Sequence, residues 1–286
     1  MKNDEMITLA KFLAISGIIL PMLPHKNLIP DINLTPYSIW LATVVVSGIS
    51  YLSYLLKRYV FHESGTLVSG IIGGLYSSTA TISVLARKSR KASEQEATDY
   101  VAAMLLAVSM MFLRFMILIL IFSREIFLSI YPYLLTMAVV AAIVAWFIHS
   151  RQKRPEDQPA ETEEDDSSNP LEFKVALIFA VLFVIFTFLT HYTLVYAGTG
   201  GLNLLSFVSG FSDITPFILN LLQNIGSVAA LIITACSMQA IISNIMVNMF
   251  YALFFAGKGS KLRPWILGGF GAVIACNLVL LLFFYL

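Results

Sequence analysis

The chain has 286 residues, of which 58% are hydrophobic and 12% charged, and its formal net charge at pH 7 is +1. A soluble domain cannot bury so large an apolar fraction, so the composition indicates an integral membrane protein in a lipid bilayer. A net charge this close to zero carries no signal of nucleic-acid binding. Cys236 and Cys276 both lie in apolar runs, where a packing role fits better than a disulfide.

The first apolar run, residues 6–24, follows a basic flank, as the apolar core of a secretory signal peptide does. No small-residue cleavage site follows it, and Pro21 and Pro24 close the segment. We therefore expect a retained first helix.

Seven runs are apolar enough, and close enough to the length of about 20 residues that a helical span requires, to cross a membrane. They cover approximately residues 6–24, 37–60, 99–122, 131–149, 171–196, 227–256 and 264–286. Two further apolar stretches, 64–87 and 201–223, are interrupted by Gly, Ser, Thr and Pro.

The distribution of Lys and Arg decides how the interrupted stretches run, because basic residues near span ends favour the cytoplasmic side. If both stretches were ordinary spans, the basic clusters at 57–58 and 87–91 would lie on opposite sides of the membrane. If both are re-entrant hairpins and the amino terminus is cytoplasmic, only Lys26 and Arg124 remain in the outer loops. The sequence thus predicts an all-α protein with seven full spans, two hairpins that enter from opposite sides, and an external carboxyl terminus. A cell (inner or plasma) membrane is the expected location.

An internal repeat is consistent with this topology. Segments 100–111 (YVAAMLLAVSMM) and 227–238 (SVAALIITACSM) share Val-Ala-Ala and a closing Ser-Met, and a Gly-x4-Thr core precedes each, at 74–79 and 210–215. Because the predicted topology runs the two copies in opposite directions, they are typical of the inverted repeats of secondary transporters.

Three parts of the chain follow from this repeat. We expect a first repeat with an extra amino-terminal helix over 1–150, a linker over 151–170, and a second, inverted repeat over 171–286. The linker, RQKRPEDQPAETEEDDSSNP, has no apolar face to bury, so it is predicted to be a disordered, acidic, cytoplasmic tether.

The two predicted hairpin tips are the candidate binding site. Non-helical chain survives at membrane depth only where it faces protein or a wet cavity. Glycines let the backbone approach a solute closely, and hydroxyls with exposed helix-end amides can hold an ion. We expect these residues to meet near the membrane midplane: Gly73, Gly74, Ser77, Ser78 and Thr79 from the first tip, and Gly210, Ser212, Asp213 and Thr215 from the second. The alternative is that the small residues only permit tight helix packing.

One acidic and one basic residue are candidates for a role deep in the membrane. Asp213 could bind a metal or sodium ion or carry a proton; alternatively, it caps a helix beside Pro216. Arg114, inside the span 99–122, could pair with Asp213 or with an anionic substrate, and it could also extend to the outer surface beyond Arg124.

Amides form a possible polar pathway on another span. Asn244 and Asn248 lie four residues apart, on one helical face, where they either line a path or hydrogen-bond helices together. The four histidines fall near predicted span ends and none lies at metal-ligand spacing from Cys or a carboxylate, so any metal ligands stay unknown.

The segment LVSGIIGGLYSSTATISVLARKSR, with LPMLP and PYSIW before it, resembles an uncharacterised membrane-domain family that is often fused behind an MgtC/SapB-type domain. Its most recognisable part is the core from Gly73 to Ala80. The resemblance covers nearly the whole chain but includes no MgtC/SapB-type domain. It implies a membrane location, and the fusion hints at divalent cations. The opposed hairpins also resemble, at the level of architecture, sodium-coupled dicarboxylate and glutamate transporters, which are dimeric in many cases.

The leading hypothesis is a secondary transporter of a small ion or anionic solute, with no cofactor, Na⁺ or H⁺ coupling, and a homodimer as one arrangement. A channel and a divalent-cation transporter are the nearest alternatives. A regulatory or structural membrane protein is the alternative from another class. We do not expect an enzyme, because an intramembrane protease needs a second acid or an interior His that the sequence does not offer convincingly.

Overall fold

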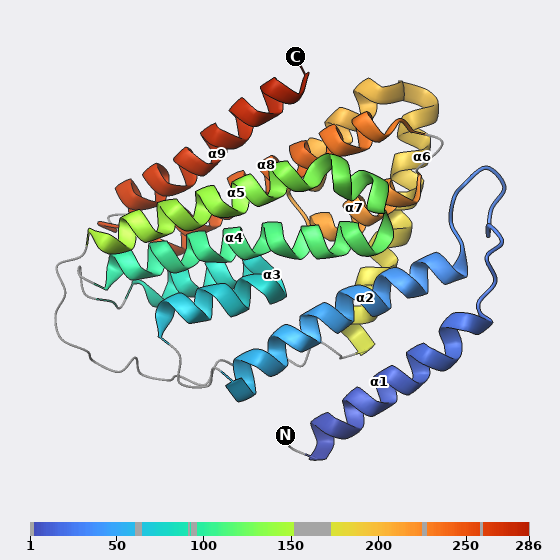
Figure 1. Cartoon of the computed structure of the whole chain (residues 1–286), viewed down its shortest axis with the longest axis horizontal. Coiled ribbons are helices and arrows are strands. Elements are labelled where there is room, and N and C mark those ends of the chain that lie inside the picture. Colours follow the sequence, from blue (N-terminus) through green and yellow to red (C-terminus); the bar gives the residue numbers. More distant parts are fainter. Residues whose placement is uncertain are drawn as a thin grey trace.

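The structure is a computed structural model that describes residues 3–60, 65–90, 92, 96–151, 173–224, 228–257 and 260–285. Within these ranges the chain is helical, without an extended strand (Figure 1). The helices are α1 (Asn3–Met22), α2 (Pro36–Leu55) with a π-helical turn η1 (Leu56–Val60), α3 (Thr66–Lys88), α4 (Ala97–Phe122), α5 (Arg124–Ser150), α6 (Phe173–Ser209), α7 (Ile214–Gln223), α8 (Ala230–Ala256) and α9 (Arg263–Tyr285).

Seven of the described helices are long and apolar enough to cross a bilayer, which confirms an all-α, multi-pass membrane protein. They are α2 to α6, α8 and α9. The predicted set of seven differed in two members. It included the amino-terminal helix α1, which is not among these seven, and it left out α3, which is interrupted.

The interruption in α3 makes it a hairpin, as predicted for 64–87. Ser77 has extended backbone angles, φ −157° and ψ 106°, inside the helix. A Cβ on Gly73 would lie 2.5 Å from the Thr81 hydroxyl oxygen, although residues eight apart on a continuous helix are about 12 Å apart. The chain therefore folds back at Ser77 into two legs, 66–76 and 78–88, which lie beside α4 in Figure 1. Each leg is about 16 Å long, roughly half of a bilayer core.

The second predicted hairpin, 201–223, is built differently. α6 turns sharply at Gly198, which has a left-handed φ of 59° that favours glycine. A Cβ on Gly201 would lie 2.9 Å from Thr193, so here too residues eight apart meet. The leg 199–209 then leads into a turn at 210–213 and returns as α7, which contacts α6.

The amino-terminal end of α5 differs from the predicted span 131–149. The helix begins at Arg124, because the Ser123 hydroxyl accepts a hydrogen bond from the Ile126 amide at 3.2 Å and caps it. Pro132, which we expected near the start, lies inside the helix instead. The prediction was wrong there because proline favours a helix start but is also found inside membrane helices.

Several contacts between helices recur, with different extents, when the two halves are exchanged. The exchange pairs α2 with α6, the α3 hairpin with the second hairpin, α4 with α8, and α5 with α9. Under it, the α3–α4 contact corresponds to α7–α8, and α4–α5 corresponds to α8–α9. The α3–α8 contact corresponds to α4–α7. The exchanged partners α2 and α6 contact each other, as do α5 and α9. Between α5 and α9, the Tyr133 hydroxyl donates a hydrogen bond to the Asn277 amide oxygen. This pattern agrees with a repeat. The boundaries of its parts stay predictions, and most of the predicted linker lies outside the described residues.

The open end of the α3 hairpin is attached to the end of α8. The Arg90 guanidinium donates hydrogen bonds to the carbonyls of Phe255 and, at 3.3 Å, Phe254. The guanidinium carbon of Arg87 lies 4.3 Å from the centre of the Phe255 ring. Cations at a helix carboxyl terminus are stabilised by the helix dipole, so the two arginines fasten the hairpin to α8.

Close packing of the hairpin against α4 gives a first prediction. A Cβ on Gly74 would lie 2.5 Å from the Ala107 Cα, so Gly74→Ala forces two backbones apart and should cost about 1–3 kcal/mol of unfolding free energy. Gly271→Ala in α9 is the matched control, because a Cβ there meets nothing within 4 Å. Thermal unfolding in detergent should show a lower midpoint for Gly74→Ala alone. Equal midpoints for the two variants would contradict this packing.

Candidate functional site

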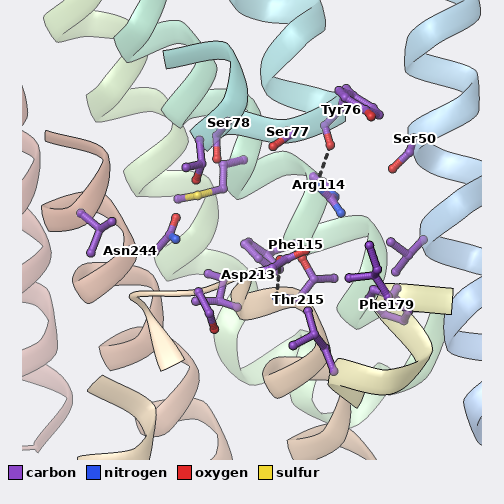
Figure 2. Close-up of a pocket in the computed structure, with 18 of the residues that line it drawn as sticks. Ser50, Tyr76, Ser77, Ser78, Arg114, Phe115, Phe179, Asp213, Thr215 and Asn244 are labelled. Carbon is purple, nitrogen blue, oxygen red and sulfur yellow. Dashed lines mark hydrogen bonds between the residues drawn. The ribbon is translucent and has the colours of Figure 1, made fainter. Parts of the chain in front are cut away.

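A pocket of about 420 Å³ lies between the two hairpin tips (Figure 2). Side chains from α2, α3, α4, α6, α8 and the 210–215 segment line it. In Figure 2, Ser77 and Ser78 lie on one side, Asp213 and Thr215 on the other, and Arg114 between them. The structure thus brings most of the predicted tip residues around one cavity: Ser77, Ser78, Thr79, Ser212, Asp213 and Thr215.

The first tip presents a helix start to the pocket. The Ser77 hydroxyl accepts a hydrogen bond from the Ala80 amide at 3.3 Å and so caps the leg 78–88. Ser77, Ser78 and Thr79 line the pocket at this end. The start of a helix carries partial positive charge and hydrogen-bond donors, so this side of the pocket suits an anionic group.

Arg114 supports the break in α3. It projects from the middle of α4 and is only 9% exposed. Its Nη1 donates a hydrogen bond of 2.9 Å to the Tyr76 carbonyl, the last residue of the leg 66–76, where the break leaves carbonyls without helical partners. The predicted alternative of an arginine that extends to the outer surface does not hold, because the side chain is buried beside the hairpin.

Arg114 also has a buried hydrogen-bond donor without an acceptor. Its Nε is buried and has no hydrogen-bond partner among the described residues. A buried guanidinium N–H without an acceptor costs about 1–3 kcal/mol or more, since the group is charged. Arg114 itself lines the pocket, so its guanidinium lies beside a cavity that can hold an acceptor.

The second tip presents a carboxylate. Asp213 is the N-cap of α7, and its Oδ1 accepts a hydrogen bond of 2.9 Å from the Thr215 amide. The Asp213 side chain remains exposed toward the pocket, so the capping interpretation and a binding role are compatible. Arg114 and Asp213 thus place opposite charges on the lining of one cavity, and they form no ion pair with each other in the described structure.

Among the described residues that line the cavity, these two are the only charged ones. The guanidinium faces the end of a helical leg, where the dipole is negative, and the carboxylate faces the start of one, where it is positive. Each tip is therefore neutralised locally, and the cavity holds one positive and one negative group.

The predicted amides of α8 support the second tip. Asn244 lines the pocket and donates a hydrogen bond of 3.2 Å to the Gly210 carbonyl. Asn248, one turn further along α8 and fully buried, donates to the Asn244 amide oxygen at 3.1 Å. Ser243 also donates to the Phe207 carbonyl, at 2.6 Å. These contacts favour the helix-bonding interpretation over a continuous polar path, because Asn248 lies behind the pocket.

Three predicted glycines lie outside the pocket lining. Gly73 faces Thr81, Gly74 faces the Ala107 backbone, and Gly210 packs on Ser243. Their role in the structure is close packing, which was the alternative interpretation at these positions.

Two groups of lining residues were not predicted. Ser47 and Ser50 of α2 face the cavity, as do the aromatic side chains Phe115, Phe179 and Tyr251. The serines could have been found, because Ser47, Ser50 and Ser53 recur at helical spacing within an apolar span. Aromatic residues are too frequent in this sequence to stand out.

In the part of the chain that the structure describes, no three His, Cys, Asp or Glu side chains are grouped closely enough to hold a metal ion. Asp213 is the only carboxylate among the described lining residues, and hydroxyls and carbonyls supply their other oxygens.

Comparison with known proteins identifies a matching family. The family model described as Domain of unknown function (DUF4010) matches residues 44–256. An uncharacterized protein of Aquifex aeolicus (strain VF5) is 24% identical over 227 residues, which are 77% of this chain and 96% of that protein. No solved structure matches.

The charge pair gives a second prediction. Arg114→Gln leaves the Tyr76 carbonyl and Asp213 without their cation, and Asp213→Asn leaves Arg114 without its anion, so each should lower the unfolding midpoint. The double variant should lose less unfolding free energy than the two single variants lose together, and the difference, the coupling energy, should be about 0.5–3 kcal/mol. Thermal unfolding in detergent measures it. As a control, Arg124→Gln lies outside the pocket, so its effect on the unfolding free energy should add to that of Asp213→Asn. If the effects of Arg114→Gln and Asp213→Asn also add, the coupling between these two residues is refuted.

Proposed function

Since the chain belongs to the DUF4010 family, whose activity is unassigned, we propose a function from its own pocket: secondary transport of a small ion or anionic solute, bound between the two hairpin tips. The observation that carries the proposal is the buried, partly unpartnered Arg114 at a cavity formed by two interrupted helices. Discontinuous helices whose ends point at a central cavity are typical of transporter substrate sites.

The physical argument begins with the cost of breaking helices inside an apolar bundle. Each unmet backbone group costs several kcal/mol in hydrocarbon, so a protein that only needed a scaffold would gain by keeping α3 continuous. The break at Ser77 instead places amides and hydroxyls beside a cavity. This arrangement supports a binding site over purely structural packing.

Alternating access follows from the repeat in this proposal. The contacts that recur in the two halves support a mechanism in which the halves exchange conformations, so that the pocket opens first to one side and then to the other. The tips lie near the membrane midplane in this arrangement, because each leg of the α3 hairpin reaches about halfway across.

Arg114 and the Ser77–Thr79 segment form the anion-binding side, and Asp213 is the site for a coupling Na⁺ or H⁺. A divalent cation is the second candidate solute, supported by the Asp213 carboxylate and by the resemblance to domains fused with MgtC/SapB-type domains. A channel would use the same pocket with a much higher flux.

The orientation and membrane belong to the proposal as well. The Lys and Arg distribution supports a cytoplasmic amino terminus, an external carboxyl terminus and the cell membrane as location. A homodimer is proposed by analogy with transporters of similar architecture.

Access to the pocket can be tested without knowing the solute. In a background of Cys236→Ala and Cys276→Ala, Ser77→Cys and Ser212→Cys should each react with a membrane-impermeant thiol reagent from both sides of sealed vesicles. Ser129→Cys, exposed on α5 and outside the pocket, is the control and should react from at most one side. Labelling of both tip cysteines from one side alone would exclude alternating access and favour a structural or regulatory protein.

Transport itself gives the next prediction. Uptake into liposomes is measured for L-leucine, succinate, phosphate, Na⁺ and Mg²⁺, and a solute that wild-type protein carries should enter about tenfold more slowly with Ser78→Ala or Thr79→Ala, since each removes a hydrogen bond of about 1.4 kcal/mol. Unchanged rates in both variants and in Asp213→Asn would refute the site. Flux far above carrier turnover would identify a channel.

A further inference from the structure

We infer that the pocket binds a small zwitterion, an amino acid whose carboxylate faces Arg114 and whose ammonium faces Asp213. This inference rests on the transport part of the proposed function. It assigns a net-neutral solute in place of a small ion or an anion, and it gives Asp213 to the ammonium in place of a coupling ion. It differs from a simple anion site because it uses both charges of the cavity.

The carboxylate end is defined by unmet donors. Arg114 is nine-tenths buried, uses one nitrogen on the Tyr76 carbonyl, and keeps a buried Nε without a partner among the described residues. Guanidinium groups bind carboxylates through two parallel N–H donors. The hydroxyls of Ser77 and Thr79, on the same side of the pocket, add donors and the start of a helix.

The ammonium end is defined by Asp213. Its Oδ1 accepts the Thr215 amide, and the exposed carboxylate faces the cavity. A monoanion on Arg114 would be repelled by this carboxylate, and a monocation on Asp213 would be repelled by the guanidinium. A ligand with both charges pairs with each group.

Charge balance also favours a zwitterion for transport. The cavity carries one positive and one negative group, so it is neutral when empty and remains neutral when a zwitterion is bound. Moving a net charge through an apolar bundle is costly, and a neutral complex avoids that cost.

The rest of the cavity has room for a side chain. Met111, Phe115, Phe179 and Leu182 form apolar walls. A volume of about 420 Å³ is ample for an amino acid with a branched apolar side chain together with a few waters. L-leucine is therefore the probe that fits the walls and both charges.

The test compares L-leucine with two derivatives that each lack one charge. Purified full-length protein is heated in detergent with L-leucine, N-acetyl-L-leucine, L-leucinamide or inorganic phosphate, and the apparent affinity is taken from the rise in unfolding midpoint. L-leucine should bind, and each of the other three should bind roughly ten- to hundredfold more weakly, the loss of one charged hydrogen-bonding partner. Arg114→Gln should abolish the L-leucine shift.

Asp213→Asn provides a readout that misfolding cannot imitate. Asparagine is an equally good helix cap, so α7 should keep its start. The variant should lose L-leucine affinity and gain affinity for N-acetyl-L-leucine, because the repulsion of the lone carboxylate is removed. Asp31→Asn and Arg124→Gln, exposed and outside the pocket, are matched controls that should leave every shift unchanged.

Equal or stronger binding of N-acetyl-L-leucine, L-leucinamide or phosphate by the wild-type protein would overturn the zwitterion, and so would the absence of any shift with L-leucine. Those results leave the transporter proposal standing if the tip cysteines are labelled from both sides. Labelling from one side alone would overturn transport whatever the ligand shifts show.

Discussion

The fold depends on how a broken helix is accommodated inside an apolar bundle. At Ser77 the backbone leaves the helical path, and the leg before it ends with carbonyls that have no helical partner. The Arg114 guanidinium donates to one of them, the Tyr76 carbonyl, from the adjacent α4. Without that contact, the Tyr76 carbonyl would lose the donor that α4 supplies.

This contact links stability to the pocket. A cation brought into the bundle to satisfy a helix end also needs a counter-charge, and Asp213 supplies it across the cavity while it caps α7. The two hairpins are thus coupled through opposite charges although no strand or disulfide joins them in the described part of the chain. The same groups therefore stabilise the tips and line the cavity.

The sequence predicted the hairpins well, because Gly, Ser, Thr and Pro interrupt apolar runs, and an interrupted helix is costly in hydrocarbon unless it faces protein or a cavity. It also identified Arg114, Asp213 and Asn244, since polar side chains at membrane depth are few. It could not separate glycines that pack from residues that line the cavity, because that depends on what lies next to them. Gly74 packs against α4, whereas Ser78 lines the pocket. The start of α5 was misplaced because Pro132 fits both the beginning and the interior of a membrane helix. Ser47 and Ser50 lie in an ordinary-looking span, and only the packing of α2 brings them to the tips.

The contact between Gly73 and Thr81 has a mechanical consequence. The two legs of the α3 hairpin touch without room for a side chain, four residues on each side of Ser77, so they cannot approach each other more closely. Arg87 and Arg90 fix the other end of the hairpin to α8. The α3 hairpin, attached at its base by Arg87 and Arg90, therefore acts as a lever. A small tilt at this base gives the largest displacement at the tip, where Ser77 and Ser78 lie.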